Sequence, residues 1–311
     1  PSAKAAKPTN FTFFGGKDES SQDLIQGITL AGAFFDEVAL MPQSFVNQAT
    51  ARCSVTGSKF WFNCNPGSPQ HWFYLEWVRK CRSRKMMYLH FTMDDNLSLS
   101  EDIKARYRSQ YSGVFYQRYI LGLWTVAEGL VYDMFDRKKH VVDVLPELSP
   151  KSAYVACDFG TQNATVFLLI QKQADADCWI VTREYYYSGR EQKRQKTVGE
   201  YVTDLKAWLK GLKPERAIVD PSALPLITEL RKNGFTQTPA NNDVLSGILD
   251  VQTMLQTGRL RIYKDCKHTL EEFGVYAWDP DKDDTVLKVN DHCMDAIRYF
   301  VRTKRLVKLR D

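Results

Sequence analysis

The sequence predicts a mixed α/β fold whose strand-rich part lies in residues 151–311. Apolar runs typical of strands at residues 154–157, 165–171 and 179–187 follow one another at short intervals. An amphipathic pattern at residues 197–210 predicts a helix, and a fourth apolar run follows at residues 216–219. Helical periodicity then returns at residues 224–232, 244–256 and 268–273, and in a closing helix from about 291 to 307.

Residues 1–124 have a different pattern, which predicts a separate domain. Short β-like pieces are expected at residues 11–14 and 28–30, an apolar run at 31–40 and a buried strand at 59–63. Helices are expected at residues 45–51, 71–78 and 100–121. Gly129, Pro146 and Pro150 then interrupt a charged stretch, which indicates that residues 125–150 connect the first domain to a second one at 151–311.

Composition narrows the class of protein. Hydrophobic residues make up 44% and charged residues 25% of the 311 residues, as in a globular domain. No apolar stretch is long enough to cross a membrane, and the first ten residues lack the apolar region of a signal peptide. The seven cysteines are scattered and form no C-x-x-C pair, which argues against a zinc site or a disulfide framework. Because the chain begins with Pro1, we expect a fragment of a longer protein.

Basic residues are clustered although the net charge is only +5. Clusters occupy residues 79–85, 190–196 and 298–310, and any one of them alone is explained as a solvated face. Three in one chain favour a polyanionic partner such as a nucleic acid.

Carboxylates follow two of the predicted strands. Asp158 ends the run YVAC, Asp220 ends the run AIV, and Asp291 and Asp295 open the closing helix. Loops diverge at strand ends, so sites form there, and crowded carboxylates favour a bound cation. Oxygen ligands without cysteine suit Mg²⁺ or Mn²⁺. Each acid alone is also explained as a turn residue or a helix cap; the metal interpretation depends on the set.

The segments ACDFG, IVDPS and NDHCMDAIRYF resemble the nuclease domain of viral terminase large subunits, the motors that package phage DNA. The resemblance implies a ribonuclease H-like fold that cuts double-stranded DNA with two metal ions. Asp158 and Asp220 match the first two ligands. The third stays open among His292, Asp291 and Asp295, with Asp158, Asp220, His292 and Asp295 as the expected catalytic residues. An imidazole ligand would favour Mn²⁺ over Mg²⁺.

The resemblance extends upstream of the nuclease. The segment AFFDE looks like a Walker B strand, in which Asp36 would hold Mg²⁺ and Glu37 would polarise the attacking water. Asn63 matches the coupling motif that follows. No G-x-x-x-x-G-K-[ST] loop is present, so residues 1–124 are expected to be the C-terminal portion of a P-loop-type ATPase domain. We expect ATP to be used only by the complete parent protein.

The basic loop and the partners follow from the same resemblance. Arg190, Lys193, Arg194 and Lys196 are expected to contact DNA phosphates. Expected partners are double-stranded DNA, the terminase small subunit, the portal protein and further copies of the chain, in the host cytoplasm and without a membrane. The alternatives are an ATP-driven translocase fragment, a non-enzymatic DNA- or portal-binding scaffold, and a resolvase or transposase of the same fold.

Overall fold

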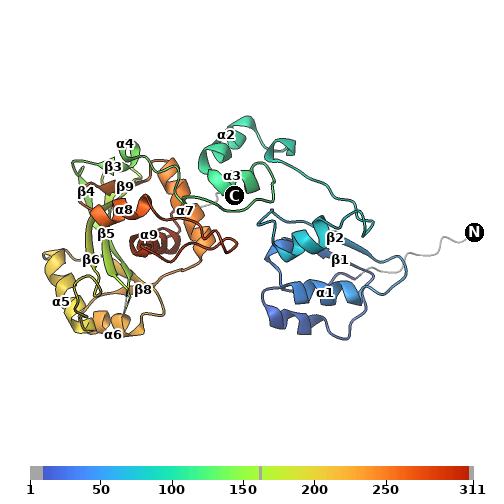
Figure 1. Cartoon of the computed structure of the whole chain (residues 1–311), viewed down its shortest axis with the longest axis horizontal. Coiled ribbons are helices and arrows are strands. Elements are labelled where there is room, and N and C mark those ends of the chain that lie inside the picture. The colour runs from blue at the N-terminus through green and yellow to red at the C-terminus, as the bar shows by residue number, and fades with distance from the viewer. Residues whose placement is uncertain (1–9, 161–162, 308–311) are drawn as a thin grey trace, which may run out of the picture. The chain divides into compact units, whose positions relative to one another are not determined.

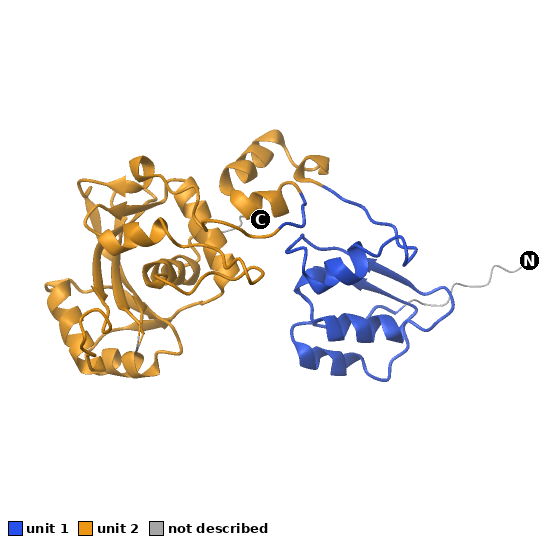
Figure 2. Cartoon of the chain, in the orientation of Figure 1, with its two compact units in different colours: residues 1–91, 122–125 blue, residues 92–121, 126–311 orange. Residues whose placement is uncertain are grey.

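The computed structural model describes residues 10–160 and 163–307, which fall into two compact units (Figure 2). Unit 1 comprises Pro1–Phe91 and Gly122–Thr125, and unit 2 comprises Thr92–Leu121 and Val126–Asp311. Each unit has its own hydrophobic core, so each is described by itself.

Unit 1 is built around two parallel strands. Strand β1 (Gly32–Phe35) pairs with β2 (Lys59–Phe62), with Phe35 opposite Phe62, and the two phenylalanine rings stack. Helix α1 (Gln43–Arg52), with η1 (Glu19–Ile25), η2 (Val38–Leu40) and the π-helical turn η3 (Tyr74–Val78), covers this pair. The expected helix at 45–51 is confirmed. The strand expected at 59–63 is present, but the prediction that it is buried was wrong, because three of its four residues are exposed. The β-like pieces expected at 11–14 and 28–30 were wrong, because these described residues form no strand.

Unit 2 contains a mixed sheet of seven strands in the order β3-β9-β6-β5-β4-β7-β8, which confirms the predicted α/β class. The pairs β4–β5 and β5–β6 are antiparallel and the other pairs are parallel. The strands are β3 (Val141–Val142), β4 (Leu148–Asp158), β5 (Thr165–Gln173), β6 (Trp179–Tyr187), β7 (Arg216–Val219), β8 (Gln237–Pro239) and β9 (Leu260–Tyr263).

Helices cover both faces of this sheet (Figure 1). Tyr154 and Ala156 of β4 belong to one core with α7 (Val244–Gln256), α8 (Lys267–Phe273) and α9 (His292–Thr303). Val155 and Cys157 belong to the opposite core with α5 (Val198–Leu209) and α6 (Leu224–Lys232). This alternation is the period of two that a strand buried on both faces requires.

The N-terminal part of unit 2 is helical and packs on the same body. Helices α2 (Glu101–Gln110) and α3 (Gly113–Tyr119) follow the short turn η4 (Met93–Asp95), and α4 (Arg137–His140) precedes β3. Much of the expected connection at 125–150 is packed in this unit, since Val131 and Tyr132 are buried and β3 pairs with β9. In the described ranges, no helix is both long and apolar enough to span a bilayer.

Candidate metal centre

Asp158 is the last residue of β4, and Asp220 directly follows β7, the neighbouring strand, so both lie at the carboxyl-terminal ends of these strands. Strands β4 and β7 run parallel with Cys157 opposite Val219, so the residue after each pair lies at the same edge. Alternation places Asp158 on the face of Ala156, and Asp220 on the face of Ile218. Helix α9 packs on this face against β4, β5 and β7. Both carboxylates therefore belong to the face that α9 covers.

The first residue of α9 contacts Asp158 directly. His292 Nδ1 lies 2.8 Å from Asp158 Oδ2, and both side chains are largely buried. Burial, together with the charges of Asp295 and Asp291, raises the pKa of Asp158 although His292 opposes this. Burial also opposes a charged imidazole, but the contact with Asp158 outweighs it and raises the pKa of His292. Without a metal the pair therefore retains protons more strongly than two isolated side chains would.

Asp220 lies in a more polar environment than Asp158. Its Oδ1 accepts a hydrogen bond from the backbone N–H of Ser222 at 2.7 Å, and Asn242 approaches its Oδ2 at 3.4 Å. Burial opposes ionisation, but the hydrogen bonds from Ser222, Asn242 and Tyr299 lower the pKa of Asp220. Burial raises the pKa of Tyr299 most, and the charges of Asp295, Asp158 and Asp220 raise it further, so its hydroxyl lies near all three carboxylates.

Asp291 and Asp295 already have cationic neighbours. Arg298 Nη2 donates to Asp295 Oδ1 at 2.8 Å, and this arginine is only 2% exposed. Lys288 Nζ lies 3.1 Å from Asp295 Oδ2 and 3.0 Å from Asp291 Oδ2. Among the described residues, the buried Asp291 Oδ2 has the ion pair with Lys288 and accepts no hydrogen bond. Asp295 therefore has two cationic partners, Arg298 and Lys288, whereas Asp291 has one.

Glu272, on α8, is a residue that the sequence patterns did not single out. Its Oε2 accepts from the backbone N–H groups of Cys293 at 2.7 Å and Met294 at 3.1 Å, at the start of α9. Burial raises the pKa of Glu272 to about 7 despite these hydrogen bonds. A carboxylate at a helix N-terminus complements the unpaired N–H groups there. Glu272 therefore fixes the turn from which His292 extends, and no local motif reveals that role.

Carboxylate and imidazole side chains are suitable ligands for a divalent cation, but those that the structure describes do not form a complete coordination site. Within residues 10–160 and 163–307, no three acidic, imidazole or thiol side chains are grouped closely enough to hold a metal ion. The carboxylates of Asp158, Asp291 and Asp295 nevertheless lie close enough to interact electrostatically, because the charges of Asp295 and Asp291 raise the pKa of Asp158 after burial does. The buried Asp291 Oδ2 also has spare accepting capacity. Clustered carboxylates with such an oxygen are what a hard cation neutralises.

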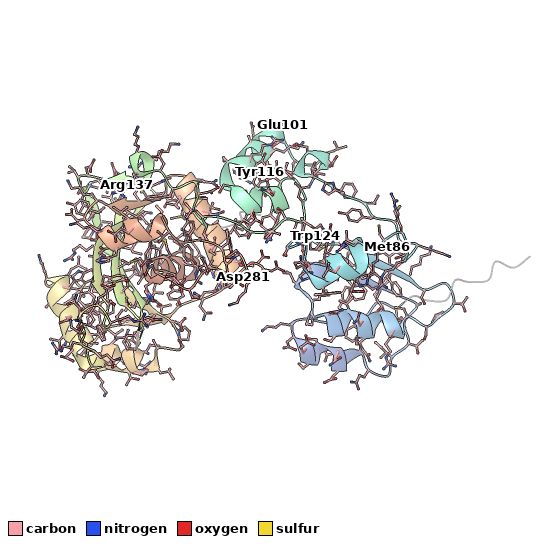
Figure 3. All side chains as sticks on the ribbon, viewed as in Figure 1. Met86, Glu101, Tyr116, Trp124, Arg137 and Asp281 are labelled. Atoms are coloured by element: carbon pink, nitrogen blue, oxygen red, sulfur yellow. The ribbon has the colours of Figure 1, made fainter. Side chains whose placement is uncertain are left out.

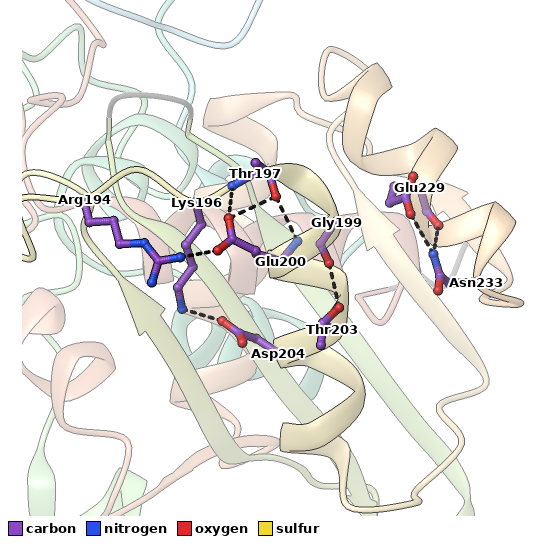
Figure 4. Close-up of a pocket in the computed structure, with 9 residues that line it drawn as sticks. All are labelled: Arg194, Lys196, Thr197, Gly199, Glu200, Thr203, Asp204, Glu229 and Asn233. Carbon is purple, nitrogen blue, oxygen red and sulfur yellow. Dashed lines mark hydrogen bonds and ion pairs between the residues drawn. The ribbon is translucent and has the colours of Figure 1, made fainter.

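The basic loop at 190–196 follows the end of β6 that lies on the same side of the sheet as the end of β4. Tyr187 of β6 pairs with Thr165 of β5, and Val166 pairs with Asp158. Arg190 and Lys193 are exposed. Arg194 instead forms an ion pair with Glu200, and Lys196 pairs with Asp204 and lies 4.0 Å from the centre of the Tyr187 ring (Figure 4).

A shallow hollow of about 490 Å³ lies beside Arg194 and Lys196, between α5 and α6. Figure 4 shows that Glu200 and Asp204 of α5 form ion pairs with Arg194 and Lys196. Of the four residues expected to contact phosphate, Arg194 and Lys196 form ion pairs with α5 in this structure, and Arg190, Lys193 and also Arg194 are exposed.

The ATPase-like residues come together in unit 1. Asn63 Oδ1 accepts from the Glu37 backbone N–H at 2.7 Å, and Asn65 Nδ2 lies 3.3 Å from Glu37 Oε1. The backbone of Glu37 has φ 53°, a left-handed conformation that costs energy for a non-glycine residue and is frequent at functional sites. Asp36 is exposed beside it. The pairing of β1 with β2 brings Glu37 and Asn63 together just beyond the ends of these two strands.

Comparisons with known proteins find similar sequences and similar folds. Residues 9–139 match the family described as terminase large subunit, T4likevirus-type, N-terminal. A solved structure of the large terminase from a thermophilic bacteriophage is 53% identical, covers 93% of this chain and 72% of its own, and superposes with a TM-score of 0.87. A second structure of that phage terminase, in complex with ADP, is 52% identical with a TM-score of 0.84, over 91% of this chain and 72% of that one.

Curated relatives match over a smaller share of their length. The terminase large subunit of Escherichia phage T5 is 25% identical over 228 residues, which is 68% of this chain and 50% of the relative. That of Salmonella phage P22 is 21% identical over 306 residues, or 91% of this chain and 57% of the relative. The chain spans about half the length of these curated relatives. On its likeness to the thermophilic-phage terminase, and on the extent of that match, the chain belongs to the phage terminase large subunit family.

Proposed function

We propose that residues 151–311 form a ribonuclease H-like nuclease domain that cuts double-stranded DNA during viral genome packaging. The observation that carries the proposal is the contact of His292 with Asp158 at 2.8 Å, which places the first residue of α9 at the end of β4, next to the strand that Asp220 follows. Membership of the terminase family supplies the substrate, and the chemistry of the side chains supplies the reaction class.

Asp158 and Asp220 would hold divalent metal, with a third ligand from the start of α9. His292 and Asp291 suit that role better than Asp295, because Arg298 and Lys288 already bind both oxygens of Asp295. Mg²⁺ and Mn²⁺ both suit the carboxylates, and His292 favours Mn²⁺. When bound, two such ions supply an activated water and stabilise the leaving oxygen of a phosphodiester.

The residues of the chain would orient this chemistry. Glu272 holds the first turn of α9, and therefore the position of His292, through two backbone hydrogen bonds. The hydrogen bonds from Ser222 and Asn242 would orient the Asp220 side chain and favour its ionised form. Arg190 and Lys193 are exposed in the loop after β6 and would contact DNA phosphates without reading sequence.

Unit 1 would belong to the ATPase domain of the complete protein. Support comes from the contact of the Glu37 backbone with Asn63 and from the strained conformation of Glu37. Because the sequence contains no phosphate-binding loop motif, we assign ATP hydrolysis to the complete parent protein and not to residues 1–124 alone. The small subunit, the portal protein and further copies of the chain are its proposed partners in the host cytoplasm.

A plasmid-nicking assay tests the nuclease. Wild-type protein is expected to nick supercoiled DNA with Mn²⁺ or Mg²⁺ and to stop when EDTA is added. Asp158→Asn and Asp220→Asn should each lower the rate by at least about a hundredfold, the effect of losing a main electrostatic contribution. The matched control is Asp175→Asn, an exposed acid in the β5–β6 turn at the opposite end of the sheet. Equal cutting by all four proteins would exclude Asp158 and Asp220 from catalysis. No cutting by wild type with either metal would favour a DNA- or portal-binding scaffold.

A further inference from the structure

A lysine ammonium lies where two of the candidate ligands meet. Lys288 Nζ is 3.0 Å from Asp291 Oδ2 and 3.1 Å from Asp295 Oδ2, so one positive charge serves two carboxylates. A lysine side chain carries a positive charge at neutral pH, so these distances describe a cation bound to the acidic cluster.

A structured hairpin delivers Lys288 to this position. Trp278 pairs with Val286, and the Leu287 backbone N–H donates to Ala277 O at 3.0 Å, one residue before Lys288. Asp281 lies near the turn of this hairpin and is labelled in Figure 3. The hairpin is tied to α3, since Arg118 donates to both oxygens of Asp284 at 3.0 and 2.6 Å. The lysine is therefore presented by a fixed segment and not by a free tail.

The two cations on Asp295 differ in how readily they can leave. Arg298 is 2% exposed, is held by the Asn242 carbonyl as well, and lies inside the core. The Lys288 side chain is 59% exposed and can swing into solvent without leaving a buried charge behind. Withdrawal of Lys288 would remove the ion-pair partner of Asp291 and would leave Asp295 with Arg298. Lys288 is thus the exchangeable cation of the cluster.

We propose that Lys288 is a resident counter-cation of Asp291 and Asp295 that competes with divalent metal for Asp291, so that metal loading requires its displacement. The proposal rests on the proposed function, because the metal is that of the nuclease site. It assigns Lys288 as a positioning residue that keeps the acidic cluster together before metal binds. It also predicts opposite effects of removing the charge, with weaker folding in the absence of metal and tighter binding of metal.

Calorimetric titration of the whole chain with Mn²⁺ alone, without DNA, tests this competition. Lys288→Met keeps most of the side-chain stem and should bind Mn²⁺ roughly fivefold to tenfold more tightly than wild type, the range expected for removing one partly exposed charge near a divalent ion. Its Tm without metal should fall, and saturating Mn²⁺ should close the difference. Lys288→Arg keeps the charge and should stay near wild type.

The matched control is Lys282→Met, in the same hairpin and paired with Asp279 outside the acidic cluster. Its Mn²⁺ affinity should equal that of wild type. Equal or weaker Mn²⁺ binding by Lys288→Met, with normal binding by wild type, overturns the counter-cation role and leaves the nuclease proposal standing. Binding by neither protein overturns both. An equal gain in Lys282→Met overturns the site-specific role, because the effect would then come from overall charge.

Discussion

His292 Nδ1 and Asp158 Oδ2 lie 2.8 Å apart although the two residues are 134 positions apart in the sequence. The contact joins the first residue of α9 to the last residue of β4, and it fixes how the closing helix meets the sheet edge. The imidazole is therefore in place to serve as a metal ligand beside Asp158.

Replacement of His292 by aspartate should change which metal the nuclease prefers. Imidazole favours Mn²⁺ relative to Mg²⁺, whereas a carboxylate suits both ions. The ratio of nicking rates in Mn²⁺ and Mg²⁺ should therefore fall in His292→Asp, after circular dichroism has shown that the variant is folded. A ratio equal to that of wild type would exclude His292 from the metal.

The buried Asp295–Arg298 pair should be a main source of stability in α9. Arg298→Met would leave the carboxylate with Lys288 alone. The loss should approach the roughly 3–5 kcal/mol of a buried charge left unpaired, because Lys288 is itself 59% exposed. Urea unfolding should show a smaller loss in the double variant Asp295→Asn/Arg298→Met than the sum of the two single variants. Additive losses would mean that the two side chains contribute independently.

Gly247 gives a steric test of the same region. A methyl group at this position would lie 2.8 Å from Arg298 Cδ and closer still to Cγ, and the arginine is held at its head group. Gly247→Ala should therefore destabilise unit 2 by about 1–3 kcal/mol.

Gly199→Ala is the control for Gly247→Ala, because nothing lies within 4 Å of the added methyl group and Gly199 is also helical. It should be neutral or stabilise by at most about 1 kcal/mol through helix propensity. Equal effects of the two substitutions in urea unfolding would argue against the tight packing of Arg298.

His140 should make stability depend on pH. Burial lowers its pKa below the ordinary 6.5, ahead of the raising effects of Leu255 O and Asp136. Its Nδ1 accepts the Asp136 backbone N–H at 2.9 Å, so protonation there would break a hydrogen bond. Because the unfolded chain binds this proton more readily, the stabilisation is complete above pH 6.5 and is lost as pH falls below it.

Urea unfolding at a series of pH values measures this effect as the slope of the free energy of unfolding against pH, compared between two proteins. Between neutral pH and mildly acidic pH, wild type should lose more stability than His140→Gln does, since other titrating groups are common to both proteins. Parallel curves for the two proteins would contradict the assignment.

Much of the fold is predictable from the sequence, and the reason is periodicity. The ranges expected for α6 and α7 coincide with the observed helices, and β5, β6 and β7 lie where the apolar runs are. Strands β8 and β9 were not predicted. The four-residue strand β7 contains the apolar run AIV, whereas β8 reads QTP and β9 has Arg261 between its apolar residues. Residues 11–14 looked β-like, yet Phe11 and Phe13 are exposed and no strand among the described residues pairs with them.

The site was predictable only in part. The strand-end positions of Asp158 and Asp220 follow from local pattern, whereas the His292–Asp158 contact depends on how α9 packs across the sheet. Arg298 follows Asp295 by three residues, a helical spacing that could have indicated their pairing. Lys288 stands three residues before Asp291 but reaches the cluster only because a hairpin presents it.

The basic loop shows the same limit of local pattern. Arg194 and Lys196 are part of a positively charged run, but α5 brings Glu200 and Asp204 against them. Sequence clustering cannot distinguish such paired charges from the exposed Arg190 and Lys193, because the pairing depends on the turn between β6 and α5.

A crystal soaked in Mn²⁺ and measured at the manganese absorption edge tests the metal centre most directly. The account predicts an anomalous peak within coordination distance of both Asp158 and Asp220, with His292 or Asp291 as a further ligand and Lys288 turned away from Asp291. A well-ordered crystal with no peak at these carboxylates, or with a peak elsewhere in unit 2, would contradict it.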